Sequence, residues 1–119
     1  MNRPRFEIGE TNVLCTDADR SLAFYRDILG FEYVTEDHGA HRLKCGSAFV
    51  LLLPIAEEPS RIITYGETAA LSFDLYAQDL GLAHDYLVDN GVEIQTVRMT
   101  DGYLIIKDPD GLLLEVVGP

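Results

Sequence analysis

Polar side chains alternate with apolar ones in two strand-like segments of this sequence, and their types are suited to chemistry. Glu10 and Asn12 fall on one face of the first segment, and Ser72 and Asp74 fall on one face of the second. Successive side chains of a strand point to opposite faces, so each segment presents its polar groups together. Tyr103, beside a predicted hairpin, is a further candidate for contact with a ligand. Such groups can hydrogen bond a small polar molecule, hold a cation or move a proton.

Other kinds of chemistry have no support in the sequence. His38 and His41 straddle a Gly–Ala turn, where histidines are usually solvated, so we do not expect them to bind a metal. Cys15 and Cys45 lie in separate apolar segments and are expected to be buried free thiols. The sequence has no glycine-rich phosphate loop, no Gly-x-Ser-x-Gly motif and no credible Cys–His pair. Nucleotide transfer and acyl-enzyme chemistry are therefore set aside.

The charge and the hydropathy pattern limit the partners. The 119 residues include 20 acidic and nine basic ones, for a formal net charge of −11, which repels phosphate backbones and anionic membrane surfaces. The longest apolar run, 48–53, is far shorter than the roughly 20 residues of a membrane span. No apolar run follows the basic residues of the N-terminus, as a signal peptide would require. We expect a cytoplasmic protein that binds neither nucleic acid nor membranes.

The first half of the sequence predicts a strand, a helix and three more strands. Asp17 or Asp19 can cap the helix, and Gly30 can end it. The predicted strands are 8–15, 31–37, 42–45 and 48–53.

The second half repeats this order. Asp79 can cap a second helix and Gly91 can end it, 61 residues after Gly30. The predicted strands are 71–76, 92–99, 103–107 and 112–117. Matching element order at a period of about 61 residues indicates a duplicated module.

We therefore predict an α+β fold of two paired βαβββ modules within a single domain. Module 1 covers about 7–54, a linker about 55–68, and module 2 about 69–119. One helix covers only one face of each small sheet, so each module gains a full core only by pairing. Pairing leaves a concave, incompletely closed mixed sheet, and small ligands usually bind such concave surfaces.

Two motifs resemble a known family. The run from Asp17 to Glu32, which contains Ser-Leu-Ala-Phe-Tyr-Arg-Asp-Ile-Leu-Gly-Phe, is similar to the first-helix signature of the vicinal-oxygen-chelate superfamily. The run from Asp108 to Val116, Asp-Pro-Asp-Gly-Leu-Leu-Leu-Glu-Val, resembles its closing turn and strand. The resemblance covers nearly the whole chain and implies the glyoxalase-like fold. The family includes glyoxalases, dioxygenases, epimerases, fosfomycin-inactivating transferases and bleomycin-resistance proteins that only bind antibiotics, so the fold does not decide the chemistry.

The resemblance also implies where a metal would be bound. Metal-dependent members take ligands from the first and last strands of both modules. Glu10 then falls at the first-strand position and Glu115 at the last-strand position, whereas Ala70 falls at the expected third position and Val50 or Leu51 at the fourth. Two carboxylates are fewer than the three or four ligands that a transition metal normally takes. The resemblance thus implies an incomplete site that holds a divalent metal weakly or not at all.

Two neighbouring carboxylates in an apolar setting require compensation. If the modules pair as in the family, Glu10 and Glu115 approach each other, and their charges repel. A metal, a shared proton, a nearby arginine or lysine, a cationic ligand, or contact with water can compensate. Together with Asn12 and Asp74, the two glutamates give an acidic cavity that accepts hydrogen bonds from amines, which favours a basic ligand.

Two functions follow from the resemblance. The first is a homodimer that binds a small polar or cationic organic molecule and acts as a metal-assisted lyase, isomerase or dioxygenase. Glu115 is then a metal ligand, Glu10 is a ligand or base, and the substrate contacts are Asn12, Ser72, Asp74 and Tyr103. The alternative is a metal-free protein of the bleomycin-resistance kind, which binds an antibiotic or toxin without turnover.

Overall fold

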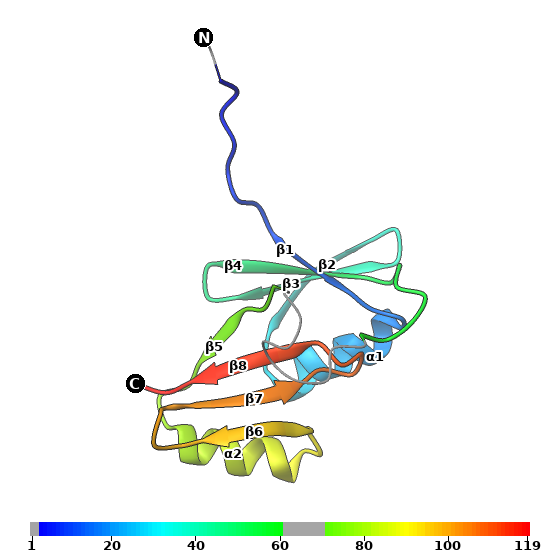
Figure 1. Cartoon of the computed structure of the whole chain (residues 1–119). Coiled ribbons are helices and arrows are strands. Elements are labelled where there is room, and N and C mark those ends of the chain that lie inside the picture. The colour runs from blue at the N-terminus through cyan, green and yellow to red at the C-terminus, as the bar shows by residue number, and fades with distance from the viewer. Residues whose placement is uncertain (1–2, 61–70) are drawn as a thin grey trace. The chain divides into compact units, whose positions relative to one another are not determined.

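A computed structural model describes residues 3–60 and 71–119 of the chain (Figure 1). The chain divides into two compact units, 1–56 and 57–119. Ala70 and most of the predicted linker lie outside the described residues. Each unit contains one helical segment and one open four-stranded mixed sheet. This confirms the predicted α+β class and the βαβββ order of both modules.

Unit 1 has its strands in the order β1-β4-β3-β2. The edge strand β1 is parallel to β4, and the other neighbours are antiparallel. The predicted first strand is shorter than expected, because the exposed residues before Thr11 run away from the sheet in Figure 1. The four strands are β1 (Thr11–Leu14), β2 (Glu32–Asp37), β3 (Ala40–Cys45) and β4 (Ala48–Leu53).

The helical segment of unit 1 begins as an α-helix and continues as a π-helix, α1 (Ala18–Leu22) and then η1 (Ala23–Ile28). Asp17 is the N-cap, and its carboxylate accepts the backbone N–H groups of residues 19 and 20. Gly30 follows with a φ of 81°, in the left-handed region that favours glycine. The predicted start and end of the helix are therefore confirmed.

The π-helical turn accounts for a difference in length between the two modules. From N-cap to terminal glycine, Asp17 to Gly30 is 13 steps, whereas Asp79 to Gly91 is 12. A π turn accommodates one additional residue within a helix. Its wide hydrogen bond runs from the N–H of Leu29 to the carbonyl of residue 24, at 3.0 Å.

The two faces of the unit 1 sheet differ. Its helix-facing side carries the buried side chains of the core, including Val13, Cys15, Leu43, Val50 and Leu52. The opposite side, here called open face 1, carries Asn12, Leu14, Arg42, Lys44, Phe49 and Leu51. Leu14 is 53% exposed and Phe49 is 39% exposed. Open face 1 is therefore a partly apolar surface without full cover.

Cysteine burial was predicted correctly for one residue and wrongly for the other. Cys15 is buried on the helix-facing side, whereas Cys45 is exposed. Cys45 is the last residue of β3, next to the turn at residues 46 and 47, and so lies at the rim of the sheet.

Unit 2 repeats the arrangement, with strand order β5-β8-β7-β6 and β5 parallel to β8. The strand β5 is half as long as the prediction for 71–76, and Leu71, before the strand begins, is exposed. Tyr86 is likewise exposed, although its spacing matches that of a core residue. The elements are β5 (Asp74–Tyr76), α2 (Leu80–Asp89), β6 (Ile94–Arg98), β7 (Tyr103–Lys107) and β8 (Leu113–Val117).

The helix α2 runs along its sheet in Figure 1 and is capped by Asp79, whose carboxylate accepts the N–H of Leu82. Gly91 follows with a φ of 75°. Among the described residues, no helix is long and apolar enough to cross a membrane.

Candidate functional site

Glu10 is held by an arginine of its own unit. The Nε of Arg42 donates to Oε2 of Glu10 at 2.7 Å, and Nη2 donates to Oε1 at 3.2 Å. The side chain of Glu10 is 29% exposed and that of Arg42 is 28% exposed. These hydrogen bonds lower the pKa of Glu10 and raise the pKa of Arg42. A nearby arginine was one of the predicted means of compensating this carboxylate.

The ion pair spans open face 1. Strand β4 lies between β1 and β3, so the bond from Glu10, just before β1, to Arg42 on β3 crosses β4. The register places Leu51 of β4 beside both Asn12 and Arg42. Asn12, a predicted substrate contact, is exposed on this face. The fourth predicted ligand position thus carries an apolar side chain.

A second basic residue lies on open face 1. Lys44 is two residues beyond Arg42 on β3, and its Nζ is 5.9 Å from the ring centroid of Phe49. Lys44 and Phe49 are neighbours in the register of β3 and β4. The distance falls within the range of a cation–π interaction.

The corresponding surface of unit 2, here called open face 2, carries two acidic residues side by side. Asp74 on β5 is the register partner of Glu115 on β8, and Ile105 of β7 lies on the other side of Glu115. Asp74 is exposed and Glu115 is half-buried. Paired positions of neighbouring strands place Cβ atoms about 5 Å apart, so the two carboxylates can act on one ligand group.

An aromatic row lies next to the acidic pair. Tyr76, Val117 and Tyr103 are register partners across β5, β8 and β7, two residues along from Asp74. The structure therefore places Tyr103 on the same face as the acidic pair, in the neighbouring row. Tyr76 is 85% exposed.

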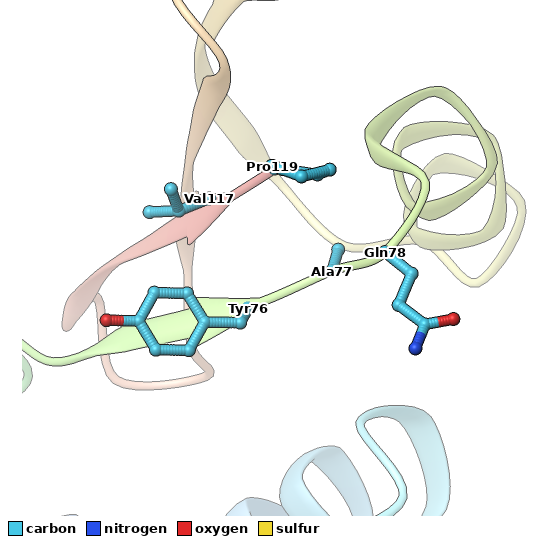
Figure 2. Close-up of a pocket in the computed structure, with 6 residues that line it drawn as sticks. Tyr76, Ala77, Gln78, Val117 and Pro119 are labelled. Carbon is cyan, nitrogen blue, oxygen red and sulfur yellow. The ribbon is translucent and has the colours of Figure 1, made fainter.

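A largely apolar pocket of about 350 Å³ lies where β5 and β8 end (Figure 2). Its lining residues are Tyr76, Ala77, Gln78, Val117, Gly118 and Pro119.

The register of the two sheets assigns a different residue to the third ligand position than the sequence did. The N–H of Cys15 donates to the carbonyl of Leu53, and the N–H of Ala77 donates in the same way to Val117. The offset between Cys15 and Ala77 is 62, equal to that between the two helix N-caps. Adding 62 to Glu10 gives Ser72, so Ser72 and not Ala70 is its counterpart.

The hydroxyl of Ser72 already has a hydrogen-bond acceptor. It donates to the backbone carbonyl of Leu113 at 2.9 Å. Ser72 was predicted as a substrate contact, and this bond directs its hydroxyl to the backbone of the neighbouring strand.

Sequence reasoning missed one polar cluster in unit 1. His41 was expected to be solvated, but it lies on the helix-facing side of β3 and its side chain is only 10% exposed. Its Nε2 lies 3.1 Å from Oδ1 of Asp19, and its Nδ1 lies 3.1 Å from the hydroxyl of Tyr33. The alternation of His41 with the buried Leu43 was the signal that could have revealed it.

The comparisons with known proteins now decide the family. Residues 7–116 match the model of the glyoxalase/bleomycin resistance protein/dioxygenase superfamily. The chain belongs to this superfamily. Among curated protein sequences, none matches the chain significantly.

Solved structures of superfamily members have the same fold. A lactoylglutathione lyase from Agrobacterium tumefaciens is 26% identical with a TM-score of 0.70, over 98% of this chain and 96% of that one. A fosfomycin resistance protein from Mesorhizobium loti is 12% identical with a TM-score of 0.73, covering 93% and 90%. A trypanothione-dependent glyoxalase I from Leishmania major is 19% identical with a TM-score of 0.76, covering 96% and 87%. The last two likenesses concern the fold alone.

The residues at the superfamily's metal positions do not fit a firmly bound transition metal in this chain. Glu10 is engaged by Arg42, and the other first-strand position is Ser72, whose hydroxyl is directed to a carbonyl. The last-strand positions are Leu51 and Glu115. Within residues 3–60 and 71–119, no group of three or more His, Cys, Asp or Glu side chains could hold a metal ion.

Proposed function

We propose that this superfamily member is a binding protein for a small organic cation with an apolar or aromatic body, and that it acts without a resident metal. The observation that carries the proposal is the pairing of Asp74 with Glu115, one row from Tyr76 and its apolar pocket. This matches the predicted alternative of a metal-free antibiotic- or toxin-binding protein.

The chemistry of open face 2 suits an amine. Carboxylates accept hydrogen bonds from an ammonium group, and the exposed ring of Tyr76 offers a face for a cation–π contact. The pocket beside Tyr76 and Val117 can take the apolar part of the same molecule. Of the basic residues on this face within the described part of the chain, Lys107 is paired with Glu93 at 3.0 Å, and Arg98 lies on the outer strand β6.

Binding of benzylamine tests the proposal. We expect Asp74→Asn and Glu115→Gln each to weaken binding about tenfold, since each removes a charged acceptor worth at least 1.4 kcal/mol. The control is Asp101→Asn, which makes the same change in the exposed β6–β7 hairpin. Benzyl alcohol, which lacks the charge, should bind more weakly than benzylamine. Equal binding of the two, or unchanged binding by both variants, would contradict the proposal.

We also propose that the protein is a homodimer. Phe6 and Ile8 are both exposed in the segment before β1. A second copy that covers these side chains would remove apolar surface from water. Light scattering on wild type and on Ile8→Asp tests this. A weak dimer has a dissociation constant of up to roughly 100 μM, so a wild-type protein that is monomeric at that concentration would contradict the proposal.

A second candidate function is a metal-assisted lyase, isomerase or dioxygenase. The observation in its favour is the same acidic pair, because two adjacent carboxylates attract hard cations such as Mg²⁺ or Mn²⁺. Metal analysis of protein purified without chelator separates the candidates. Stoichiometric metal that is lost on Glu115→Gln supports the enzyme, and its absence from both proteins supports the binding protein.

A further inference from the structure

We infer that open face 1 is a recognition site for the carboxylate of a small aromatic molecule, with Arg42 as the anchor and Glu10 as an internal occupant that the ligand displaces. This site lies on unit 1, and it does not depend on the amine site proposed for unit 2. The two sheets of the chain thus carry surfaces that favour ligands of opposite charge.

Arg42 already displays the geometry that a ligand carboxylate needs. Its Nε and Nη2 each donate to a different oxygen of Glu10, at 2.7 and 3.2 Å. This two-point arrangement matches the planar fork of a guanidinium to the two oxygens of a carboxylate. Another carboxylate can take the place of Glu10 without rearrangement of Arg42.

A second positive charge stands near the first. Lys44 lies on the same face of β3 as Arg42, over the ring of Phe49. Its neighbour on β2 is Glu32, but no ion pair within 4 Å joins these two described residues. The ammonium group is therefore available to add attraction for an anion and to hold it near the ring.

The surroundings of the ion pair suit an aromatic body rather than a bare anion. Leu51 lies beside Arg42 in the register, and Phe49 and Leu14 are both exposed on the same face. An aromatic ring laid on these side chains would remove apolar area from water while its carboxylate meets the guanidinium.

The position of Glu10 allows its carboxylate to dissociate from Arg42. It lies before Thr11, where β1 begins, in an exposed segment that no described strand pairs with. Segments with few buried contacts open at low free energy. Exchange of one carboxylate for another keeps Arg42 paired, and the affinity of the ligand is then reduced by the strength of the internal pair.

Displacement of Glu10 by the ligand fixes the direction in which a substitution of Glu10 changes the affinity for an anion. Removal of the charge of Glu10 should strengthen the binding of an anion, because the competitor is lost. If Glu10 instead contacted the ligand or a metal directly, the same substitution would weaken binding. The opposite signs make Glu10→Gln the decisive variant.

Titration of the full chain with benzoate, followed by backbone amide NMR, tests the proposal. We expect Arg42→Gln to weaken benzoate binding at least tenfold and Glu10→Gln to strengthen it about tenfold. The matched controls are Arg26→Gln and Asp27→Asn, which break the similarly short Arg26–Asp27 pair of 2.8 Å. Both controls should bind benzoate within about twofold of wild type. Benzamide, of the same shape without the charge, should bind at least tenfold more weakly than benzoate.

Several results would overturn the proposal. These are weaker benzoate binding by Glu10→Gln, unchanged binding by Arg42→Gln, equal binding of benzamide, or no binding of benzoate by Glu10→Gln at about 10 mM. If Arg42→Gln fails to fold, Arg42→Lys serves instead. Lysine keeps the positive charge but lacks the two-point hydrogen bonding of the guanidinium, so we expect the affinity for benzoate to fall about threefold or more.

The same titrations separate this inference from the amine site. Asp74→Asn should leave benzoate affinity within about twofold, and Arg42→Gln should do the same for benzylamine. Failure of either proposal is therefore visible without reference to the other.

Discussion

The two units share one topology but carry different chemistry on their open faces. The register pairs Glu10 with Ser72, Arg42 with Ile105, and Leu51 with Glu115 as counterparts. Open face 1 is crossed by an ion pair and carries a second cation, whereas open face 2 presents two adjacent carboxylates. The comparison indicates that the residues of the helix-facing sides maintain the fold. The residues of the open faces can differ between the units and so determine which ligand is bound.

Core substitutions should show the largest effects and should be similar in both units. Leu43 and Ile106 are counterparts on the helix-facing sides, and both are fully buried. We expect Leu43→Ala and Ile106→Ala each to lower the free energy of unfolding by about 2–5 kcal/mol, measured by urea denaturation. The exposed Val97→Ala is the control. A loss below about 1 kcal/mol at either buried position would contradict equal roles for the two sheets.

The buried histidine is one residue at which the helix-facing sides differ. The counterpart of His41 is the fully buried Leu104. We expect His41→Leu to cost about 1–2 kcal/mol, because it removes the bonds to Asp19 and Tyr33. Tyr33→Phe removes only one of them and should cost less. A stabilised His41→Leu protein would show that the polar cluster serves something other than stability.

Local patterns predicted the elements well, because caps, glycines and alternation act over a few residues. Asp17, Gly30, Asp79 and Gly91 mark the helix ends as expected. The strand 103–107 was predicted to the residue.

Contacts between residues that are far apart in the sequence depend on the order of the strands and could not be predicted from local patterns. The sequence could not pair Glu10 with Arg42, because this requires β3 to lie two strands from β1. The counterpart of Glu10 was misplaced at Ala70, 60 residues further on, whereas the offset is 62 between the helix N-caps and 61 between the terminal glycines. His41 was misjudged because its proximity to a turn was weighted above its alternation with Leu43.

The helix caps offer a finer comparison of the units. The carboxylate of Asp17 accepts two backbone N–H groups, whereas that of Asp79 accepts one. We expect Asp17→Ala and Asp79→Ala each to lower the free energy of unfolding by about 0.5–2 kcal/mol, with the larger loss at Asp17. Chemical denaturation followed by circular dichroism measures both, and the reverse order would contradict this explanation.

The pH dependence of the ion pair should be the smallest effect. Arg42 lowers the pKa of Glu10 below its ordinary value of 4.5, so the native state favours the charged carboxylate. The stabilisation is complete above the ordinary value and is lost as the pH falls through the lowered pKa. The stability difference between wild type and Glu10→Gln should thus vanish on acidification. A difference that grows in acid would contradict the assigned pair.

The central claim is that Arg42, and not a metal ion, is the cation at Glu10. The most direct test follows the carboxyl carbon signals of Glu10 and Glu115 by NMR while Mn²⁺ is added to the wild-type protein. We predict that the signal of Glu10 stays sharp at one equivalent of Mn²⁺. Simultaneous broadening of Glu10 and Glu115 at one equivalent would show a shared metal site and would contradict the claim.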